Sequence, residues 1–292
     1  MHEAINKADA LIEALNYIRQ FKGRIVVVKL GGSLMETDQN QRELLTDIVF
    51  MATVGMQPIL VHGGGKSISA AMKKAGIEPQ FVQGRRYTDE RTLAIAEHVL
   101  VNEINQQIVQ TITELGIPAM GLHSLSSCVL MAEQTRLEGP NGRQIDIGLV
   151  GNITSVNGHL LRALCASGTI PVIAPIARDR SGGKLNINAD TAAGMVAASA
   201  QCEKLVMMSD THGIFADPGD PATQISRLSE AEIQPLIDKG VISGGMLPKV
   251  DACLTALHAG VGRTHIINGS FPHSLLLEIY TDKGIGTLIT RE

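Results

Sequence analysis

The sequence predicts an α/β protein with a parallel or mixed central sheet. Short apolar runs that are typical of buried strands lie at 25–28, 58–61 and 170–174. Each run is followed by a turn, and a segment with helical spacing of apolar residues comes before the next strand. Chains in which strands and helices alternate in this way usually form a mainly parallel sheet covered by helices.

Composition and charge narrow the possible functions. The 292 residues suffice for one large domain or two lobes with a sizeable core, and 44% of them are hydrophobic. A net charge of −4 without a long basic run disfavours nucleic acid binding. No apolar stretch approaches the roughly 18 residues of a membrane span, and no secretory signal opens the chain. We therefore expect a cytoplasmic protein that binds neither nucleic acid nor membrane.

The cysteines are widely separated along the chain and include no C-x-x-C pair. They are Cys128, Cys165, Cys202 and Cys253. We expect reduced and mostly buried thiols, and no metal site built from cysteine.

Residues 3–21 have the spacing of an amphipathic helix. Apolar residues recur there at intervals of four, three, four and three, at Ala4, Ala8, Leu11, Leu15 and Ile18. This heptad-like seam suits pairing with a helix of another subunit, although the helix can also pack back on its own subunit. We favour pairing, because the helix precedes the first strand and the core does not obviously need it.

The first strand carries a lysine at its carboxyl end, followed by Gly31 and Gly32. Lys29 is costly to bury there unless an anion meets it. The glycines let the backbone come close, so that its N–H groups can donate to the same anion. Since open α/β sheets bind ligands at the carboxyl ends of their strands, residues 29–33 form a candidate phosphate site. An ordinary turn with a lysine that reaches solvent is the equally good alternative.

A second glycine-rich turn, at 62–67, follows the strand at 58–61 and leads into a helix. A strand, a glycine turn and a helix N-terminus together bind anions through free N–H groups and the helix dipole. The turn is not a Walker A motif, because Leu60 stands where that motif requires glycine. The sequence contains no G-x-G-x-x-G motif either, so a dinucleotide-binding fold is disfavoured.

A polar turn precedes a long helix that is predicted to end near residue 115, with Thr88 or Asp89 as its cap. Arg85 and Arg86 lie in this turn. Adjacent arginines before a helix can hold a carboxylate through a bidentate contact. Solvation of both charges at the surface is the simpler alternative.

Polar residues cluster again at 186–190, where a helix of small residues begins. Asn186, Asn188 and Asp190 exceed what a helix cap needs, which indicates a ligand, although Asp190 could simply favour the helix dipole. A third glycine-rich turn places Lys249 at a helix start, where a cation opposes the dipole. That placement indicates a compensating anion, and we favour a phosphate.

These segments, in this order, resemble the amino acid kinase family, and within it the acetylglutamate kinase group. Any one of them is a weak signal, but the ordered set is specific. The resemblance runs from about residue 10 to the C-terminus and is carried by VVVKLGGSLM (26–35), ILVHGGGKSI (59–68), G-x-R-x-T (84–88), GLVGNI (148–153), IPVIAPI (170–176), NINADTAAG (186–194), KLVMMSD (204–210), ISGGMLPKV (242–250) and LLLEIYTDKGIGT (275–287).

The family implies a three-layer αβα sandwich with a mainly parallel central sheet, preceded here by the N-terminal helix. Residues 1–21 would form an oligomerisation helix. Residues 22–184 would form an N-terminal lobe for acetylglutamate binding and dimerisation, and 185–292 a C-terminal lobe for the nucleotide. The implied reaction is ATP-dependent phosphorylation of the side-chain carboxylate of N-acetyl-L-glutamate in arginine biosynthesis. Mg²⁺ would be held chiefly by ATP oxygens and water, with no metal site on the protein.

The resemblance also implies roles for particular residues. Lys29 and Lys249 would neutralise the transferring phosphoryl group and the departing phosphate, and Asp190 would orient both lysines. The substrate would be bound by Gly64, Gly65, Arg86 and Asn186. The nucleotide would lie along Gly31, Gly32, Ser209, Asp210, Gly213 and Gly245. The acceptor carboxylate is already ionised at neutral pH, so no general base is needed and we interpret His62 as structural.

An effector site is implied as well. Acetylglutamate kinases that arginine inhibits are hexamers, built as trimers of dimers that join through such an N-terminal helix. By resemblance, arginine would be an inhibitor of this chain and would be bound by Tyr17, His265, Glu278 and Gly284. A carboxylate and an aromatic ring suit a guanidinium group physically.

Two other functions remain compatible with the sequence. The acceptor could be a different carboxylate, namely glutamate, aspartate or carrier-bound aminoadipate. The chain could also be a non-catalytic arginine-sensing subunit that keeps the fold for binding. Lys29, Asp190 and Lys249 argue against this last function, because a binding module has no use for all three.

Overall fold

The computed structural model of the protein describes residues 2–35, 38–124, 126–127, 129–139, 142–217, 219–281 and 284–292. Its centre is an eight-stranded sheet with the strand order β14-β16-β15-β11-β1-β2-β8-β5. Neighbouring strands are parallel, except that β16 runs antiparallel to β15. The strands are β1 (Ile25–Leu30), β2 (Gln57–His62), β5 (Ala119–Leu122), β8 (Ile170–Ile173), β11 (Lys204–Ser209), β14 (Arg227–Ser229), β15 (Arg263–Asn268) and β16 (Thr287–Thr290). The predicted mainly parallel sheet is confirmed.

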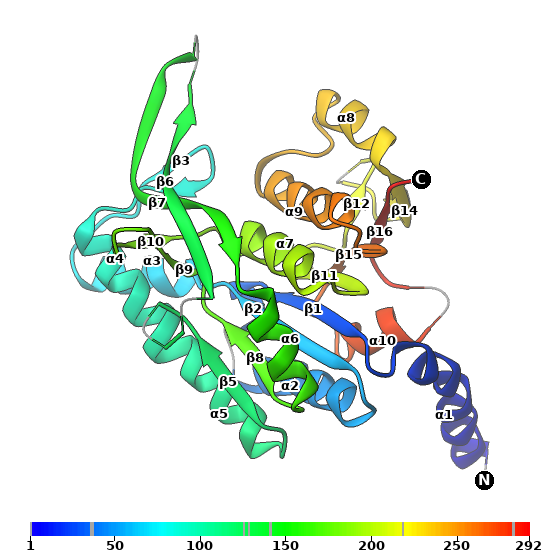
Figure 1. The fold of residues 1–292 in the computed structure, drawn as a ribbon. Helices are drawn as coiled ribbons and strands as arrows, with labels where there is room; N and C mark the ends of the chain where they lie inside the picture. Colours follow the sequence, from blue (N-terminus) through cyan, green and yellow to red (C-terminus); the bar gives the residue numbers. More distant parts are fainter. Residues whose placement is uncertain are drawn as a thin grey trace.

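Helices cover both faces of this sheet (Figure 1). They are α1 (His2–Phe21), α2 (Asp38–Thr53), α3 (Gly65–Lys74), α4 (Glu90–Glu97), α5 (Gln106–Glu114), α6 (Gly158–Ala166), α7 (Ala189–Ala200), α8 (Glu230–Asp238), α9 (Leu247–His258) and α10 (Ser274–Tyr280). Short 3-10 helices span Gly32–Met35, Pro221–Thr223 and Gly244–Met246.

The central strand β1 supplies both cores, because its side chains alternate between the two faces. Val27 belongs to a buried cluster with Val196 of α7, on the face that α6, α7 and α9 cover. Val28 belongs to a second cluster with Ile48 of α2 and Leu275 of α10 on the opposite face. Two apolar cores separated by one sheet confirm the predicted three-layer sandwich.

A small closed barrel stands beside the central sheet. Its strands are β6 (Leu130–Glu138), β7 (Gln144–Val156), β9 (Ile176–Arg178) and β10 (Lys184–Asn186). The hairpin of β6 and β7 projects from the body of the molecule (Figure 1), and the predicted substrate residue Asn186 is the last residue of β10. Two short hairpins complete the described strands, β3 (Phe81–Val82) with β4 (Arg85–Arg86) and β12 (Ile214–Phe215) with β13 (Gln224–Ile225).

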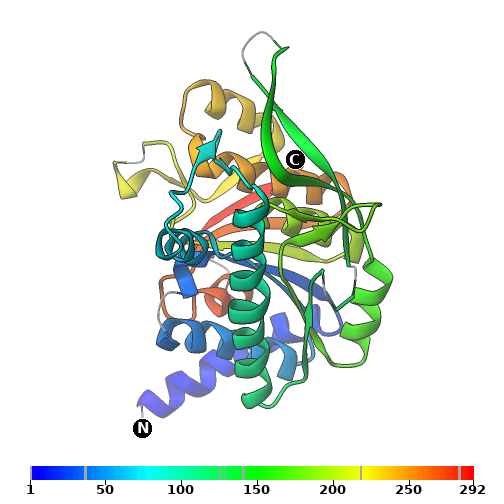
Figure 2. The ribbon, with the colours of Figure 1, turned by 90° about the vertical axis from the view of Figure 1, so that its left-hand side faces the viewer.

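The long helix predicted to end near residue 115 is not a single regular helix. Asp89 caps α4 by accepting a hydrogen bond of 2.7 Å from the Thr92 N–H, so Asp89 and not Thr88 is the cap. The segment His98–Asn105 between α4 and α5 is a π-helix. It forms the tall helical column facing the viewer in Figure 2, together with α5. π-Helical turns are frequent at functional sites, and the apolar spacing alone did not reveal this one.

α1 extends away from the body of the molecule (Figure 1). The C-terminal part of α1 packs against its own subunit, since Tyr17 and Ile18 contact the apolar cluster that includes residues of α10. Ile5 and Ile12 are 48% and 68% exposed, so this part of the helix offers apolar surface. Of the predicted seam, the side chains of Ala4, Ala8 and Leu11 lie outside the described residues. Pairing with another subunit stays a prediction.

Two expectations from composition can be compared with the fold. Cys165, Cys202 and Cys253 are free and buried, as predicted, and Cys128 lies outside the described residues. Over the ranges that the structure describes, we find no helix with the length and apolarity needed to cross a membrane.

Candidate active site

The site begins at the carboxyl ends of β1 and β2, which lie side by side at the centre of the sheet. Lys29 is only 6% exposed, so its ammonium group is held inside the protein. Gly31 follows β1 and donates its N–H to the Met208 carbonyl oxygen at 3.0 Å. A Cβ atom at Gly31 would lie 3.0 Å from that same oxygen, so a larger residue would be crowded at this position.

Asp190 joins the two lysines that sequence analysis singled out. The Lys29 Nζ atom lies 2.7 Å from Asp190 Oδ1, and the Lys249 Nζ atom lies 3.1 Å from Asp190 Oδ2. Asp190 stands in the first turn of α7, whose cap Asn188 accepts hydrogen bonds from the Asp190 and Thr191 N–H groups. Lys249 stands in the first turn of α9. Lys29 precedes Asp190 in the chain and Lys249 follows it, yet the two lysines share one carboxylate.

The electrostatics of this triad indicate an anionic ligand. Burial lowers the pKa of the Lys29 ammonium below its ordinary value, although Asp190 opposes the shift. Burial alone would raise the pKa of the Asp190 carboxyl, but Lys29 and Lys249 outweigh it and hold that pKa below its ordinary value. Two cations and one anion therefore leave a net positive charge in a poorly solvated place, which an anion would compensate.

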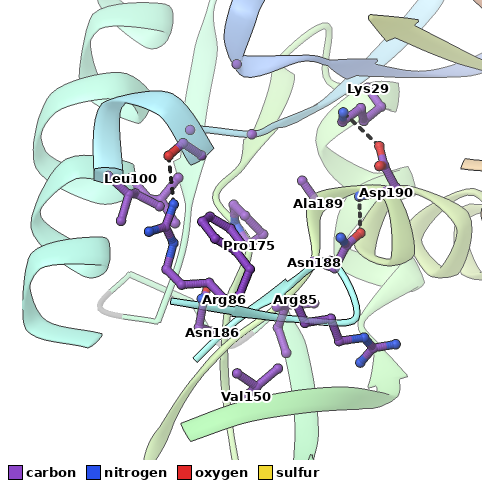
Figure 3. A pocket seen from close by; sticks show the side chains of 18 residues that line it. Lys29, Arg85, Arg86, Leu100, Val150, Pro175, Asn186, Asn188, Ala189 and Asp190 are labelled. Atoms are coloured by element: carbon purple, nitrogen blue, oxygen red, sulfur yellow. Dashed lines mark hydrogen bonds and ion pairs between the residues drawn. The ribbon is translucent and has the colours of Figure 1, made fainter. Parts of the chain in front are cut away.

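A cavity of about 220 Å³ opens beside the triad (Figure 3). Seven of the predicted site residues line it, namely Lys29, Gly32, Gly64, Gly65, Arg86, Asn186 and Asp190. The glycine turns after β1 and β2 face each other here, because a Cβ atom at Gly32 would lie 3.4 Å from the backbone nitrogens of Gly64 and Gly65. Both turns can therefore direct backbone N–H groups at one ligand.

Arg86 lies at the end of the cavity away from Lys29 (Figure 3). It is 8% exposed, and its Nη2 donates to the Gly65 carbonyl oxygen at 2.8 Å and to Ser69 Oγ at 2.7 Å. Its guanidinium carbon lies 4.8 Å from the centre of the Phe81 ring. Burial lowers the pKa of Arg86, as expected for a desolvated cation that a bound carboxylate would stabilise.

Thr88 links two of the predicted substrate residues, Arg86 and Asn186. Its Oγ1 donates to the Arg86 carbonyl oxygen at 3.0 Å and accepts from Asn186 Nδ2 at 3.2 Å. Thr88 is fully buried, so it fixes the distance between the strand that carries Arg86 and the strand that carries Asn186. Sequence analysis treated Thr88 as a possible helix cap and as part of the G-x-R-x-T motif, and it missed this role.

Comparison with known proteins decides the family. The model of the amino acid kinase family matches residues 24–268. The chain belongs to this family. This kinase is 43% identical to an acetylglutamate kinase from Halothermothrix orenii over 292 residues, 100% of both chains. It is 46% identical to an acetylglutamate kinase from Pelotomaculum thermopropionicum over 289 residues, 98% of both chains.

Among solved structures, the kinase is similar to a different enzyme with the same fold. N-acetylglutamate synthase from Neisseria gonorrhoeae, complexed with coenzyme A and N-acetyl-glutamate, superposes with a TM-score of 0.85 at 28% identity. The match covers 98% of the kinase but only 63% of the synthase chain. A complex of the same synthase with coenzyme A and L-arginine superposes with a TM-score of 0.81 at 26% identity, over 98% of the kinase and 65% of the synthase. The kinase thus spans less than two thirds of the synthase.

The remaining predicted nucleotide residues of the kinase lie outside this cavity. Ser209 ends β11, the strand next to β1, and its Oγ lies 2.8 Å from Thr211 Oγ1. Gly213 has a φ of +104°, and a Cβ atom there would lie 2.6 Å from Thr287 Oγ1. Asp210 follows Ser209 and acts on the charge of Lys29, and the Gly245 carbonyl oxygen accepts a hydrogen bond from Lys249. The nucleotide role of these residues stays a prediction.

Mg²⁺ finds a poor ligand in the buried carboxylate of this kinase. Both Asp190 oxygens already face lysine ammonium groups. Within the described part of the chain, no group of three or more His, Cys, Asp or Glu side chains is placed to hold a metal ion. The donor set therefore fits an ion whose ligands come chiefly from phosphate oxygens and water.

A second cavity of the kinase, of about 260 Å³, lies between α1, α10 and the amino ends of β11 and β15. It is lined by all four predicted effector residues, Tyr17, His265, Glu278 and Gly284. His265 Nδ1 pairs with Glu278 Oε1, and Glu278 Oε2 accepts the Ile285 N–H at 2.9 Å. Burial lowers the pKa of His265, whereas burial alone would raise that of Glu278, which His265 holds below its ordinary value.

Sequence analysis missed a cation in this second cavity. Lys204 lines it, and its ammonium lies 5.4 Å from the centre of the Phe21 ring. Burial lowers the pKa of Lys204 to about 8, although Glu278 opposes the shift. A lysine directly before four apolar residues of a buried strand is the signal that could have revealed it.

Proposed function

We propose that the chain transfers the γ-phosphoryl group of ATP to the side-chain carboxylate of N-acetyl-L-glutamate. The observation that carries the proposal is a small cavity with Lys29 and Asp190 at one end and Arg86 at the other. Lys249 contacts Asp190 without lining this cavity. This arrangement suits a dicarboxylate that places one carboxylate on the arginine and the other near the two lysines. The acetylglutamate kinases that match over the full length support the same substrate.

The residues would act by position and charge. Lys29 and Lys249 would stabilise the negative charge that spreads over the transferring and leaving phosphate oxygens, with Asp190 fixing both ammonium groups. Backbone N–H groups of Gly32, Gly64 and Gly65 would add directed donors. No base is needed, because the attacking carboxylate is already ionised. Mg²⁺ bound to ATP would neutralise phosphate charge when present.

We propose the following roles for the two parts of the chain. Residues 22–184 would bind the acid and form the dimer, and 185–292 would bind the nucleotide along Ser209, Asp210, Gly213 and Gly245. Gly31 and Gly32 of the first lobe would also lie along the nucleotide. The reaction is the acyl-phosphate-forming step of cytoplasmic arginine synthesis. Since Asp190 contacts lysines from β1 and α9, both parts of the chain meet at the transferred group.

A substrate panel tests the assignment. The purified protein is incubated with ATP, Mg²⁺ and hydroxylamine, which traps acyl phosphates as hydroxamates. N-acetyl-L-glutamate should give hydroxamate far faster than glutamate, aspartate or a carrier-bound aminoadipate. Faster turnover of another acid would move the assignment to that acid. Absence of turnover with every acid would favour the non-catalytic arginine-sensing alternative.

Replacement of Arg86 tests the substrate clamp. Arg86→Ala should raise KM for N-acetylglutamate roughly ten- to a hundredfold, because a charge-assisted contact to the carboxylate is lost. The KM for ATP should change little. The neighbouring Arg85→Ala provides the comparison, since Arg85 donates to Asn152 Oδ1 at 3.3 Å and should raise KM less. An unchanged KM in Arg86→Ala, or equal effects of the two variants, would contradict the clamp.

We propose in addition that L-arginine inhibits the enzyme by binding the second cavity, and that the enzyme is a hexamer joined through α1. Glu278 would meet the guanidinium group and Tyr17 would pack against it. The exposed Ile5 and Ile12 supply apolar surface for pairing of α1 helices. The N-acetylglutamate synthase of the same fold that was solved with L-arginine supports an arginine site on this scaffold.

Deletion of residues 2–20 tests both statements together. The truncated enzyme should fall from hexamer to dimer in light scattering, because the α1 contacts are gone. Arginine inhibition should also be lost, since Tyr17 lines the cavity from α1, while kcat without arginine stays within a few-fold of the full chain. An unchanged particle mass would show that α1 packs only on its own subunit. Retained inhibition would contradict the placement of arginine.

A further inference from the structure

His62 ends β2 beside the cavity and is fully buried. Each of its ring nitrogens has a partner. Nδ1 lies 3.1 Å from the Gly63 carbonyl oxygen, and Nε2 lies 3.1 Å from Nδ2 of Asn105. Asn105 is the last residue of the π-helix and is itself 2% exposed. The pair has no part in the chemistry proposed above, yet it lies directly behind the glycine turn that lines the cavity.

The orientation of the Asn105 amide follows from a third group. Asn105 Nδ2 also donates to the Val172 carbonyl oxygen at 3.0 Å. Val172 lies on β8, the strand next to β2. A reversed amide would place the Asn105 oxygen against the carbonyl oxygen of Val172, two acceptors without a proton between them. The β8 carbonyl therefore keeps the NH₂ group on the side of His62.

This orientation fixes the tautomer of His62. An NH₂ group only donates, so the facing Nε2 of neutral His62 must accept, and the ring proton must reside on Nδ1. The Nδ1–H group then donates to the Gly63 carbonyl oxygen. Full burial lowers the pKa of His62 to about 4, so the imidazole is neutral at physiological pH. The titratable group that faces His62 is His123, which follows β5 and whose own pKa is lowered by burial.

The hydrogen bond from His62 affects the cavity through the peptide group between Gly63 and Gly64. The Gly63 carbonyl and the Gly64 N–H belong to the same planar unit and point in opposite directions. The Gly63 N–H is held as well, since it donates to the Leu30 carbonyl oxygen at 2.9 Å. A hydrogen bond to the Gly63 carbonyl on one side therefore aims the Gly64 N–H on the other.

The π-helix that carries Asn105 also closes the space around Gly64. A Cβ atom at Gly64 would lie 2.7 Å from Leu100 Cδ2 and 2.8 Å from Ile104 Cδ1, both in this helix. The same π-helix therefore holds the glycine turn in two ways, by apolar packing next to Gly64 and by the Asn105–His62 hydrogen bond.

We propose that His62 and Asn105 are positioning residues for the reaction. Asn105 holds His62 in the Nδ1–H tautomer, and His62 in turn orients the Gly63–Gly64 peptide so that its N–H donates to the bound substrate or to the transferring phosphoryl group. The proposal rests on the phosphoryl-transfer function stated above and adds two residues that never touch the reactants.

The tautomer is tested first, on the unliganded wild-type protein. Long-range ¹⁵N–¹H spectra of histidine-labelled enzyme distinguish a protonated Nδ1 from a protonated Nε2. We expect the His62 ring, identified by its absence in His62→Gln, to show the proton on Nδ1 over the neutral pH range. A proton on Nε2 would overturn the proposal, whether or not the enzyme phosphorylates acetylglutamate.

The catalytic consequence is tested with Asn105→Asp. At high pH the new carboxylate should attract the proton to Nε2 and leave an unprotonated Nδ1 against the Gly63 carbonyl. We expect kcat to fall roughly ten- to a hundredfold there, comparable to or less than the loss of one directed donor. Uptake of one proton by the histidine–carboxylate pair restores Nδ1–H, so the ratio of variant to wild-type kcat should rise as pH falls from about 8.5 to about 6.

Asn102→Asp is the matched control. Asn102 lies on the same π-helix, and its Nδ2 lies 3.2 Å from His98 Nδ1, but this pair is exposed to solvent. The same substitution next to a histidine should leave kcat and its pH dependence unchanged. The positioning role would be wrong if the ratio of Asn105→Asp kcat to wild-type kcat did not vary with pH. It would also be wrong if that ratio had the same pH dependence as the ratio of Asn102→Asp kcat to wild-type kcat.

Two further variants, His62→Asn and His62→Gln, test the positioning role even if Asn105→Asp folds poorly. His62→Asn places an amide N–H near the position of Nδ1, whereas His62→Gln places it near Nε2 and fills the volume better. We expect His62→Asn to retain the higher kcat even where His62→Gln retains the higher Tm. If kcat simply follows Tm across the two variants, His62 only fills space and the proposal is wrong.

Discussion

Lys29→Met should lower kcat by about a thousandfold or more while the protein still folds. The ammonium group lies 2.7 Å from Asp190 at the carboxyl end of the central strand and would be lost from the place where phosphoryl charge develops. Methionine fills a similar volume, and it removes a buried cation whose pKa burial already lowers. Steady-state kinetics measure the effect, and KM for both substrates should change much less than kcat.

Lys74→Met is the control for Lys29→Met. Lys74 is the last residue of α3, the helix that begins at Gly65 beside the cavity. Lys74 is exposed in the last turn of α3, so Lys74→Met should leave kcat unchanged. Circular dichroism should show the wild-type spectrum for both variants. A folded Lys29→Met enzyme with kcat within a few-fold of wild type would contradict the charge-neutralising role of Lys29.

Asp190→Asn should lower kcat by roughly a hundredfold and change its pH dependence. In the wild type, Asp190 opposes the effects of burial and of Lys249, which lower the pKa of Lys29. Without the carboxylate only the smaller effect of Asp210 still opposes them, so Lys29 loses its proton at a lower pH. The kcat of the variant should therefore fall as pH rises through neutrality, over a range in which wild-type kcat stays flatter.

Asp47→Asn is the matched control for Asp190→Asn. Asp47 is another buried aspartate, 1% exposed, and it pairs with Nδ1 of His273 at 2.7 Å, away from the cavity. The control substitution removes a buried carboxylate of a different ion pair and should not alter the pH dependence of kcat. Parallel pH profiles for wild type and Asp190→Asn would show that Asp190 does not tune Lys29.

The fold was largely predictable because its strands are short, apolar and separated by helices with clear spacing. β1 is a run of β-branched residues that is buried on both faces, and such a run has few other structural solutions. The π-helix at His98–Asn105 was not predictable, since its apolar residues continue the spacing of the flanking helices. The small barrel was not predicted either, because closure depends on pairings such as that between β6 and β9, far apart along the chain.

Site residues could be predicted from the sequence where a residue type is unusual for its position in a strand or helix. Lys29 in a buried strand and Lys249 at a helix start each break a local preference, and the structure places both on Asp190. Thr88 and Asn105 break no such preference. Each is a polar residue in an ordinary position, and its role arises only from partners that folding brings near.

One isotope measurement tests the central claim most directly. N-acetyl-L-glutamate labelled with ¹⁸O only in its side-chain carboxylate is incubated with the enzyme, unlabelled ATP, Mg²⁺ and hydroxylamine. If the carboxylate attacks the γ-phosphorus, one of its oxygens bridges the acyl phosphate and leaves with the phosphate when hydroxylamine attacks the carbonyl carbon. We expect the released phosphate to carry one ¹⁸O atom per molecule, in step with hydroxamate formation. Release of unlabelled phosphate would mean that water or another group accepts the phosphoryl group, and the proposed reaction would be wrong.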